Sequence, residues 1–469
     1  MAIPGSRHPS LAQRAEARAR LLLPELQQRG LRQLAITFVN HGGLPLVKGI
    51  PLARLPQVAA SGVGFSPVSD GFGATGGIDG LQSLARPDGD LRLIPDLDSL
   101  VLLDVASGWG WLAGDRFEQD GSPYAADQRS FCRLQGDAAA MAGMTVNAGF
   151  EIEWVVGSPS GVGGYLSPTI GGSPYGADRL IEGLDYLSAI TAALDAAGLP
   201  WLQIHPEYGA SQFELSLAAA DPLQAADQLV CARLIIQRVS LRFGWRASFS
   251  PMVSSERVGN GGHVHLSLER DGVPLFGGGN GPGGLTTPGQ GALAALLERL
   301  PALLAIATPL AVSYRRLVPG RWAAPFQIWG VENREAALRL IPGGPEESSH
   351  LELKVVDAAA NPYLLLGALL AVMVHGIDHP SPLPPPVVGD PARLGLTDTG
   401  ENPAAPARLP RQLSEAVEHL RRDDLLAGVM GEALHHTVIE SREAELRRSA
   451  NLSEADLIAT TCWWPPIQA

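Results

Sequence analysis

One stretch of the chain decides its fold: Gln203-Ile-His-Pro-Glu-Tyr-Gly-Ala-Ser-Gln-Phe-Glu-Leu-Ser216. The pattern is typical of a strand, a turn and a second strand, in which apolar residues such as Phe213 alternate with polar residues such as Glu214. Glu207 lies at the turn, so two carboxylates meet on one sheet face beside His205. Paired carboxylates cost free energy unless a cation or solvent neutralises them. Taken alone, the stretch fits a solvated sheet face as well as a metal site.

Three other segments repeat this alternation of polar and apolar residues. They are Glu151-Ile-Glu153-Trp154, His263-Val-His265-Leu-Ser267-Leu268 and His350-Leu-Glu352-Leu-Lys354. Strands of a sandwich more often present Thr, Ser and Lys to water, so four such strands indicate a funnel lined by ligands. Glutamates with one or two histidines and no cysteine thiolate suit Mg²⁺ or Mn²⁺ better than Zn²⁺.

Six motifs in this chain resemble those of the glutamine synthetase superfamily, in the family's order. They are Glu-x-Glu at Glu151, Glu-x(6)-Glu at Glu207, Gly-x-Gly-x-His-x-His at Gly259, Arg-Leu-Val-Pro-Gly at Arg316, Asn-Arg-x(4)-Arg at Asn333, and Glu-x-Lys at Glu352 followed by Asn-Pro-Tyr at Asn361. Each motif alone is weak, but six in order are specific. The resemblance runs from about Ile36 to the C-terminus and is greatest to a divergent actinobacterial-type branch, some members of which join glutamate to organic amines.

The resemblance implies an α+β glutamine synthetase fold. We expect a small N-terminal β-grasp domain with a preceding helix over residues 1–128. We expect a large catalytic domain over residues 129–469, with a curved antiparallel sheet that forms an open funnel. The resemblance also implies a homo-oligomer, typically a dodecamer, with active sites between adjacent subunits.

Local patterns predict the elements of both domains. Helices are expected at 10–29, 131–142, 178–197, 221–243, 292–311, 362–375 and 411–450, and a strand pair at 34–39 and 46–50. Loops are expected at 157–176 and 274–291, and a proline-rich connector at 383–407.

Composition excludes several classes of partner. The chain has 469 residues, enough for two domains, and a formal net charge of -13, which argues against nucleic acid or an anionic membrane. The longest apolar run, around 363–374, is too short to span a bilayer. Three cysteines without a C-x-x-C motif indicate reduced thiols in a cytoplasmic protein.

The resemblance implies two divalent ions and ATP as a substrate. Family members use ATP to make a γ-glutamyl phosphate, which an amine then attacks, and the ions neutralise the phosphates. The motifs give one ion the ligands Glu153, Glu207 and Glu214, and the other ion Glu151, His263 and Glu352. For each glutamate the alternative is a solvated sheet face.

The same motifs imply the substrate contacts. Glutamate would lie against the turn Gly259, Asn260 and Gly261, beside His263, with Arg316 on its carboxylate and Lys354 where most members carry Arg. Arg316, Arg334 and Glu352 are the predicted catalytic residues, and His265, Ser267, Arg334 and Arg339 would contact the nucleotide. The alternatives are a helix-surface pair of Arg334 and Arg339 with Glu335, and a core role for His265.

Two departures from the family pattern concern the amine. Asn40 replaces the Asp that binds ammonium from the neighbouring subunit, and the flap Gly320–Pro325 lacks the family's Glu. Ammonium is strongly hydrated, so losing both acids should raise its desolvation cost by several kcal/mol, on the order of a lost buried ion partner. Trp322 offers an aromatic face to an organic amine instead, although it could simply pack.

These observations predict an ATP-dependent ligase that joins the γ-carboxylate of glutamate to an organic amine, such as a polyamine or ethanolamine. Two alternatives stay open. One is a glutamine synthetase with a rearranged ammonium site, and the other is a catalytically silent homologue that binds glutamate or nucleotide.

Overall fold

The computed structural model describes residues 9–78, 83, 88–159, 166–343, 349–394, 396–397, 400–401 and 405–466. Within these residues the chain forms a six-stranded sheet, a ten-stranded sheet and a separate two-stranded ribbon, with helices packed around them. The predicted loop at 157–176 and the connector at 383–407 lie partly outside the described residues. The mixture of helices and sheets is the predicted α+β class.

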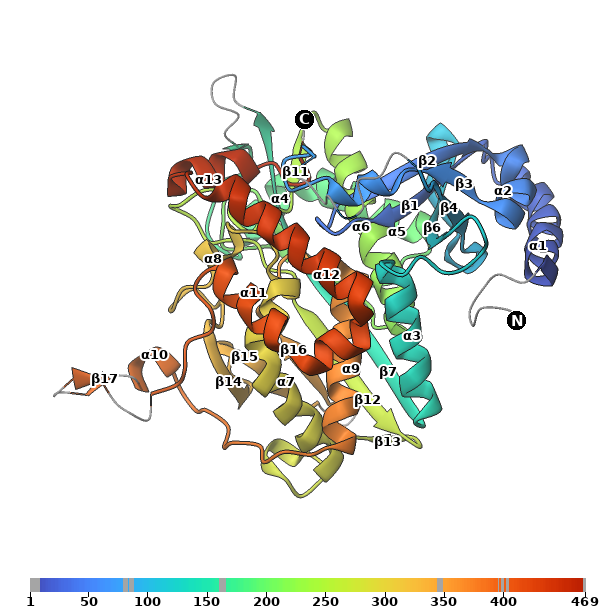
Figure 1. Cartoon of the computed structure of the whole chain (residues 1–469). Helices are drawn as coiled ribbons and strands as arrows, with labels where there is room; N and C mark the ends of the chain where they lie inside the picture. Colours follow the sequence, from blue (N-terminus) through green and yellow to red (C-terminus); the bar gives the residue numbers. More distant parts are fainter. Residues whose placement is uncertain are drawn as a thin grey trace.

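The six-stranded sheet forms in the N-terminal part of the chain (Figure 1). Its elements are α1 (Pro9–Gln28), β1 (Gln33–Val39), β2 (Pro45–Pro51), α2 (Leu55–Ser61), β3 (Val63–Phe65), β4 (Leu91–Pro95), β5 (Val101–Asp104) and β6 (Trp109–Phe117). The strand order is β2-β1-β6-β4-β3, with β5 paired to β6. The β1–β2 hairpin is antiparallel, whereas β1 and β6 are parallel.

The rest of the chain builds the ten-stranded sheet and its helices. Its first half contains α3 (Gln128–Met141), β7 (Met144–Pro159), β8 (Leu166–Pro168), α4 (Ala177–Glu182), α5 (Leu184–Ala197), β9 (Trp201–Pro206), β10 (Gln212–Leu217), α6 (Pro222–Arg242), β11 (Arg246–Ser248), β12 (Val264–Arg270) and β13 (Val273–Pro274). Its second half contains α7 (Thr287–Ala307), α8 (Ser313–Arg316), β14 (Phe326–Val331), β15 (Ala336–Ile341), β16 (His350–Leu353), α9 (Pro362–Asp378), α10 (Pro391–Leu394), β17 (Leu396–Thr397), β18 (Gly400–Glu401), α11 (Leu413–Arg422), α12 (Asp424–Ser449) and α13 (Glu454–Thr461).

Long strand β7 joins the two halves of the large sheet. The order is β14-β15-β16-β12-β7-β10-β9, so β7 pairs with β12 along its first half and with β10 along its second. The sheet is not wholly antiparallel as predicted, because β14 and β15 are parallel. Residues 332–335 form the short link between those two strands, and Arg339 lies in β15, so the alternative of a helical Arg334–Arg339 pair is wrong.

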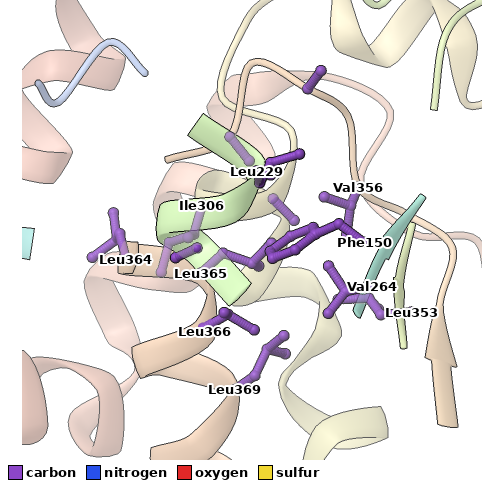
Figure 2. Close-up of a cluster of buried hydrophobic side chains, with 14 of the residues drawn as sticks. Phe150, Leu229, Val264, Ile306, Leu353, Val356, Leu364, Leu365, Leu366 and Leu369 are labelled. Atoms are coloured by element: carbon purple, nitrogen blue, oxygen red, sulfur yellow. The ribbon is translucent and has the colours of Figure 1, made fainter. Parts of the chain in front are cut away.

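The core lies on one face of this sheet. Figure 2 shows Phe150 of β7, Val264 of β12 and Leu353 of β16 among the side chains of α6, α7 and α9. These strand residues are buried, and each stands next in sequence to a predicted site residue. Because successive strand residues point to opposite faces, burying this apolar row directs the neighbouring Glu and His side chains away from the core.

Helix ends follow local rules where the sequence predicted them. The Asp221 side chain accepts a hydrogen bond from the Leu223 amide, and Pro222 occupies the first turn of α6. By length and composition alone, helix α7 is long and apolar enough to cross a membrane. However, 83% of its apolar window is buried inside the protein, and one such helix is weak evidence for a membrane span.

Arg129 of α3 links the two sheets. Its guanidinium donates to the carboxylates of Asp96 and Asp115, which belong to the N-terminal part, and to Asp227 of α6, at 2.5–3.0 Å. The side chain is only 4% exposed. Arg133 also pairs with Asp96 and Asp115, but its side chain is 38% exposed.

We expect Arg129→Ala to lower the free energy of unfolding by about 3–5 kcal/mol, because it leaves buried carboxylates unpaired. The matched change Arg133→Ala should cost less than about 1 kcal/mol, since that pair is open to solvent. Denaturant unfolding measures both values. Equal losses in the two variants would contradict this interpretation of the link.

Candidate active site

A pocket of about 260 Å³ opens on the side of the large sheet away from the core of Figure 2. Its walls come from strands β7, β9, β10, β15 and β16 and from the loops before β12 and β14. The lining residues are Glu151, Glu153, Tyr175, Gln203, His205, Glu207, Tyr208, Glu214, Val258, Gly259, Gly261, His263, Arg316, Arg321, Trp322, Ala323, Arg334, Arg339, Glu352 and Lys354. All six predicted metal ligands are among them.

Strand register brings these ligands together. Glu214 of β10 lies directly opposite Glu153 of β7 on one side and His205 of β9 on the other. Glu352 of β16 lies opposite His265 of β12 and Arg339 of β15. Residues directly opposite on one face have Cβ atoms about 5 Å apart. Strand pairing alone therefore brings the carboxylates of Glu214 and Glu153 close together.

Three groups of side chains could each hold a metal ion, with one ligand atom per residue and all atoms within 4.8 Å of one another. They are Glu151–His263–Glu352, Glu153–Glu214–His263 and His205–Glu207–Glu214. The first group equals one predicted set. The other predicted set, Glu153, Glu207 and Glu214, is divided between the remaining two groups, which share Glu214. His205 is a candidate ligand that the predicted sets omitted.

Around Glu153 the pocket has more acidic than basic side chains. Burial, with the carboxylates of Glu214 and Glu207 nearby, raises the pKa of Glu153 to about 8. Burial would also raise the pKa of Glu352, but Lys354 and the histidines outweigh it and lower the pKa to about 2. A carboxyl group that binds a proton at neutral pH because other carboxylates crowd it is a place where a divalent cation would be favourable.

Hydrogen bonds hold the ligands in place. Nδ1 of His263 lies 3.0 Å from Oε2 of Glu151 and 3.5 Å from Oε1 of Glu352. The amide of Gln212 donates to Oε2 of Glu153 at 3.0 Å. The hydroxyl of Tyr175 donates to Oε1 of Glu207 at 2.7 Å. The oxygen-rich donor set with one or two imidazoles therefore fits hard ions such as Mg²⁺ or Mn²⁺.

The glycine turn before β12 touches the ligands directly. A Cβ on Gly261 would lie 2.7 Å from Nε2 of His263 and 2.8 Å from Oε1 of Glu153, so a larger residue there would displace both side chains. Gly259 and Gly261 line the pocket. Asn260 does not: it is fully buried, donating to the Ser250 carbonyl and accepting from Gln212. The Asn260 side chain therefore supports the turn from behind, and contact of the turn itself with glutamate stays a prediction.

Basic side chains form the opposite wall. Arg316 is buried, and its Nη2 donates to the Val356 carbonyl at 2.8 Å, which fixes the guanidinium plane. Nη1 of Arg339 donates to Glu352 at 3.1 Å, and Nζ of Lys354 donates to the same carboxylate at 3.2 Å. Arg334 is exposed at the pocket wall. These four cations line the same pocket as the acidic groups.

Two predicted nucleotide contacts do not line this pocket. Nε2 of His265 lies 3.3 Å from Oε1 of Glu151, and its ring lies beside that of His350, with ring centres 5.1 Å apart and planes tilted by 52°. Ser267 lies further along β12, opposite Asn147 of β7. Their contact with a nucleotide stays a prediction.

The residues of the amine prediction lie apart. Trp322 stands at the pocket with 51% of its surface exposed. Asn40 is fully buried in its own chain: its amide donates to the Ser69 and Phe72 carbonyls and accepts from the Leu44 amide. A buried side chain with these bonds offers no surface to a substrate, so the structure does not support Asn40 as a direct contact.

Sequence reasoning missed an aromatic corner of the pocket. Tyr175 and Tyr208 meet edge to face with ring centres 5.0 Å apart, and Tyr175 also lies 5.6 Å from the His205 ring. Tyr208 is a neighbour of Glu207 in the first quoted stretch, so its position there was a usable signal. Tyr175 comes from the glycine-rich loop before α4, which carried no signal.

Known proteins are similar to this chain over most of its length. A family model described as the glutamine synthetase catalytic domain matches residues 125–457. A gamma-glutamylpolyamine synthetase of Streptomyces coelicolor is 42% identical over 470 residues, covering 98% of each chain. A glutamine synthetase of Pyrococcus horikoshii is 28% identical, covering 88% of this chain and 89% of the relative.

Solved structures of similar shape come from the same group of proteins. One is described as a novel glutamine synthase homolog, with 30% identity and a TM-score of 0.81, covering 92% of this chain and 98% of that chain. Another, GmaS in complex with ADP, has 27% identity and a TM-score of 0.81, covering 92% and 97%.

Metal binding should release a proton at pH 7. Glu153, with its pKa raised to about 8, is mainly protonated there, and a bound ion would displace that proton. We expect about one proton per chain on addition of Mg²⁺, and metal affinity that falls up to about tenfold per pH unit below pH 8. A pH indicator in weak buffer measures the release.

Glu153→Gln should abolish this release, whereas Glu298→Gln, at an exposed glutamate of α7, should leave it unchanged. Metal binding by the unaltered chain without proton release at pH 7 would contradict the argument.

Proposed function

The chain belongs to the glutamine synthetase family and has its fold, and from that premise we propose that it is an ATP-dependent ligase that joins the γ-carboxylate of glutamate to an organic amine. The proposed amines are polyamines, ethanolamine or similar compounds rather than ammonium. The name of the Streptomyces coelicolor relative, a gamma-glutamylpolyamine synthetase, supports the polyamine class.

One observation carries the proposal: the six carboxylate and imidazole ligands converge on the same pocket as Arg316 and Trp322. A phosphoryl-transfer site needs such ligands, and a flap without an acid is unsuited to capture of bare ammonium. An exposed indole at the pocket wall can receive the charged or apolar part of an organic amine.

The chain's own groups account for most of the proposed reaction. Glu151, His263 and Glu352 would hold one divalent ion and Glu153, Glu207 and Glu214 the other. Bound ions neutralise the ATP phosphates and align the transfer. Arg316, whose guanidinium is held by its hydrogen bond to the Val356 carbonyl, would bind the glutamate carboxylate. A planar guanidinium can donate to two carboxylate oxygens at once.

The remaining cations would act on the transferring phosphoryl group. Arg334 and Arg339 present positive charge at the same wall, and such charge favours the negative transition state. Lys354 would contact the γ-carboxylate as a point charge rather than as a fork. The amine would then attack the γ-glutamyl phosphate from the side of Trp322 and displace inorganic phosphate.

Wider features of the proposal follow the family. We propose two or more Mg²⁺ or Mn²⁺ ions per site, a division into residues 1–128 and 129–469, and a cytoplasmic homo-oligomer, a dodecamer, with sites between adjacent subunits. Cys132, Cys231 and Cys462 are buried, and no disulfide joins them in the described part of the chain.

An amine screen tests the substrate. With ATP, Mg²⁺ and glutamate, we expect release of ADP and phosphate with putrescine, spermine or ethanolamine, and little with ammonium, methylamine or aniline. Turnover with ammonium alone would indicate a glutamine synthetase. No turnover with any amine, but retained nucleotide binding, would indicate a silent homologue.

Replacing a ligand tests the metal assignment. Glu207→Ala should reduce turnover by at least about 10³-fold, since one of the charges that hold an ion is lost. Glu298→Ala, at an exposed glutamate outside the pocket, should leave turnover unchanged. Near-normal activity of Glu207→Ala would defeat the assignment.

A further inference from the structure

The flap, residues 320–325, has an unusual backbone. Trp322 has φ = +54° and Ala324 has φ = +53°, both in the left-handed region, and Gly320 has φ = +74°. Non-glycine residues reach this region only at a cost in free energy, and they stay there when surrounding contacts enforce it. Something must therefore hold the flap in the shape that presents Trp322 to the pocket.

Glu335 supplies a contact at the middle of the flap. Its Oε1 accepts a hydrogen bond from the Trp322 amide at 3.0 Å, and the carboxylate also interacts with the Gly320 amide. The side chain is only 4% exposed, and Oε2 is buried without a hydrogen-bond partner in the described part of the chain. Burying a carboxylate in this way costs free energy, which its hydrogen bonds to the flap help to offset.

Arg408 contacts the last residue of the flap and the chain just before the flap. Its Nη2 donates to the Leu317 carbonyl at 3.3 Å and its Nε donates to the Pro325 carbonyl at 3.2 Å. The guanidinium also lies 5.0 Å from the centre of the Phe326 ring. Arg408 is far from Glu335 in sequence, yet its positive charge favours the Glu335 carboxylate.

We propose that Glu335 and Arg408 form a brace that fixes the flap, and that Glu335 is a positioning residue for amine selection. The brace acts through the flap residues that line the pocket, Arg321 and Trp322. With the flap fixed, Trp322 offers a rigid aromatic face to an organic ammonium or alkyl chain. The role of Glu335 in amine selection rests on the proposed function. The brace itself, meaning the contacts that fix the flap, does not depend on it.

Amide hydrogen exchange tests the brace without any enzymatic assay. In Glu335→Ala the Trp322 amide loses its acceptor, so peptides covering 318–326 should exchange at least about tenfold faster, as expected for a lost hydrogen bond to a charged group. Glu335→Gln keeps an acceptor oxygen and should retain most of the protection. Glu298→Ala should not change exchange in the flap. Unchanged exchange in Glu335→Ala would overturn the brace.

Steady-state kinetics tests the selectivity. In Glu335→Ala the KM for the amine should rise about tenfold while the KM for ATP changes less than about twofold, because the flap lines only one part of the pocket. Glu335→Gln should recover most of the amine affinity. Equal increases in both KM values would overturn the positioning role and indicate general damage.

The two measurements separate the two ideas. If the unaltered chain ligated no amine but Glu335→Ala still loosened the flap, the proposed function would fail and the brace would stand. If the chain ligated organic amines and Glu335→Ala changed neither exchange nor the amine KM, the proposed function would stand and the brace would fail.

Discussion

The structure depends on one constraint. In the strands of the large sheet, acidic residues alternate with apolar residues, so burying the apolar residues on one face places the acidic residues together on the other. Glu153 and Glu214 are opposite residues of adjacent strands, and they cannot turn apart while the residues beside them, Ile152 and Phe213, are buried in the core. Repulsion between such carboxylates is therefore built into the fold, and together with burial, which is the larger cause, it raises the pKa of Glu153. Divalent cations relieve this repulsion, so the packing of the domain and its metal chemistry have the same cause.

The part of the pocket that is proposed to bind the amine is shaped in a different way. Its shape depends on a flap in a costly backbone conformation rather than on regular strand pairing. The flap carries Arg321 and Trp322, and the only acid hydrogen-bonded to it among the described residues, Glu335, is buried behind it rather than exposed to a substrate. A site that binds its ions on a rigid sheet and selects its amine with a braced loop can change substrates without disturbing phosphoryl transfer.

Much of the lining of the candidate metal site could be predicted from sequence, because strand alternation is local. Glu151, Glu153, His263 and Glu352 reach the pocket for the same reason that Phe150 and Val264 reach the core. What depended on distant parts of the chain was missed or wrong. The burial of Asn260 requires Gln212 and Ser250, and the contact of Arg408 with the flap crosses more than eighty residues. The parallel pairing of β14 with β15 has no local signal either.

The most direct measurement of the central claim is anomalous X-ray scattering from a crystal of the protein soaked in Mn²⁺. The account predicts at least two strong peaks per chain: one near Glu151, His263 and Glu352, and another near Glu214 with Glu153 or Glu207. An empty pocket at saturating Mn²⁺, or peaks only at surface carboxylates, would contradict it.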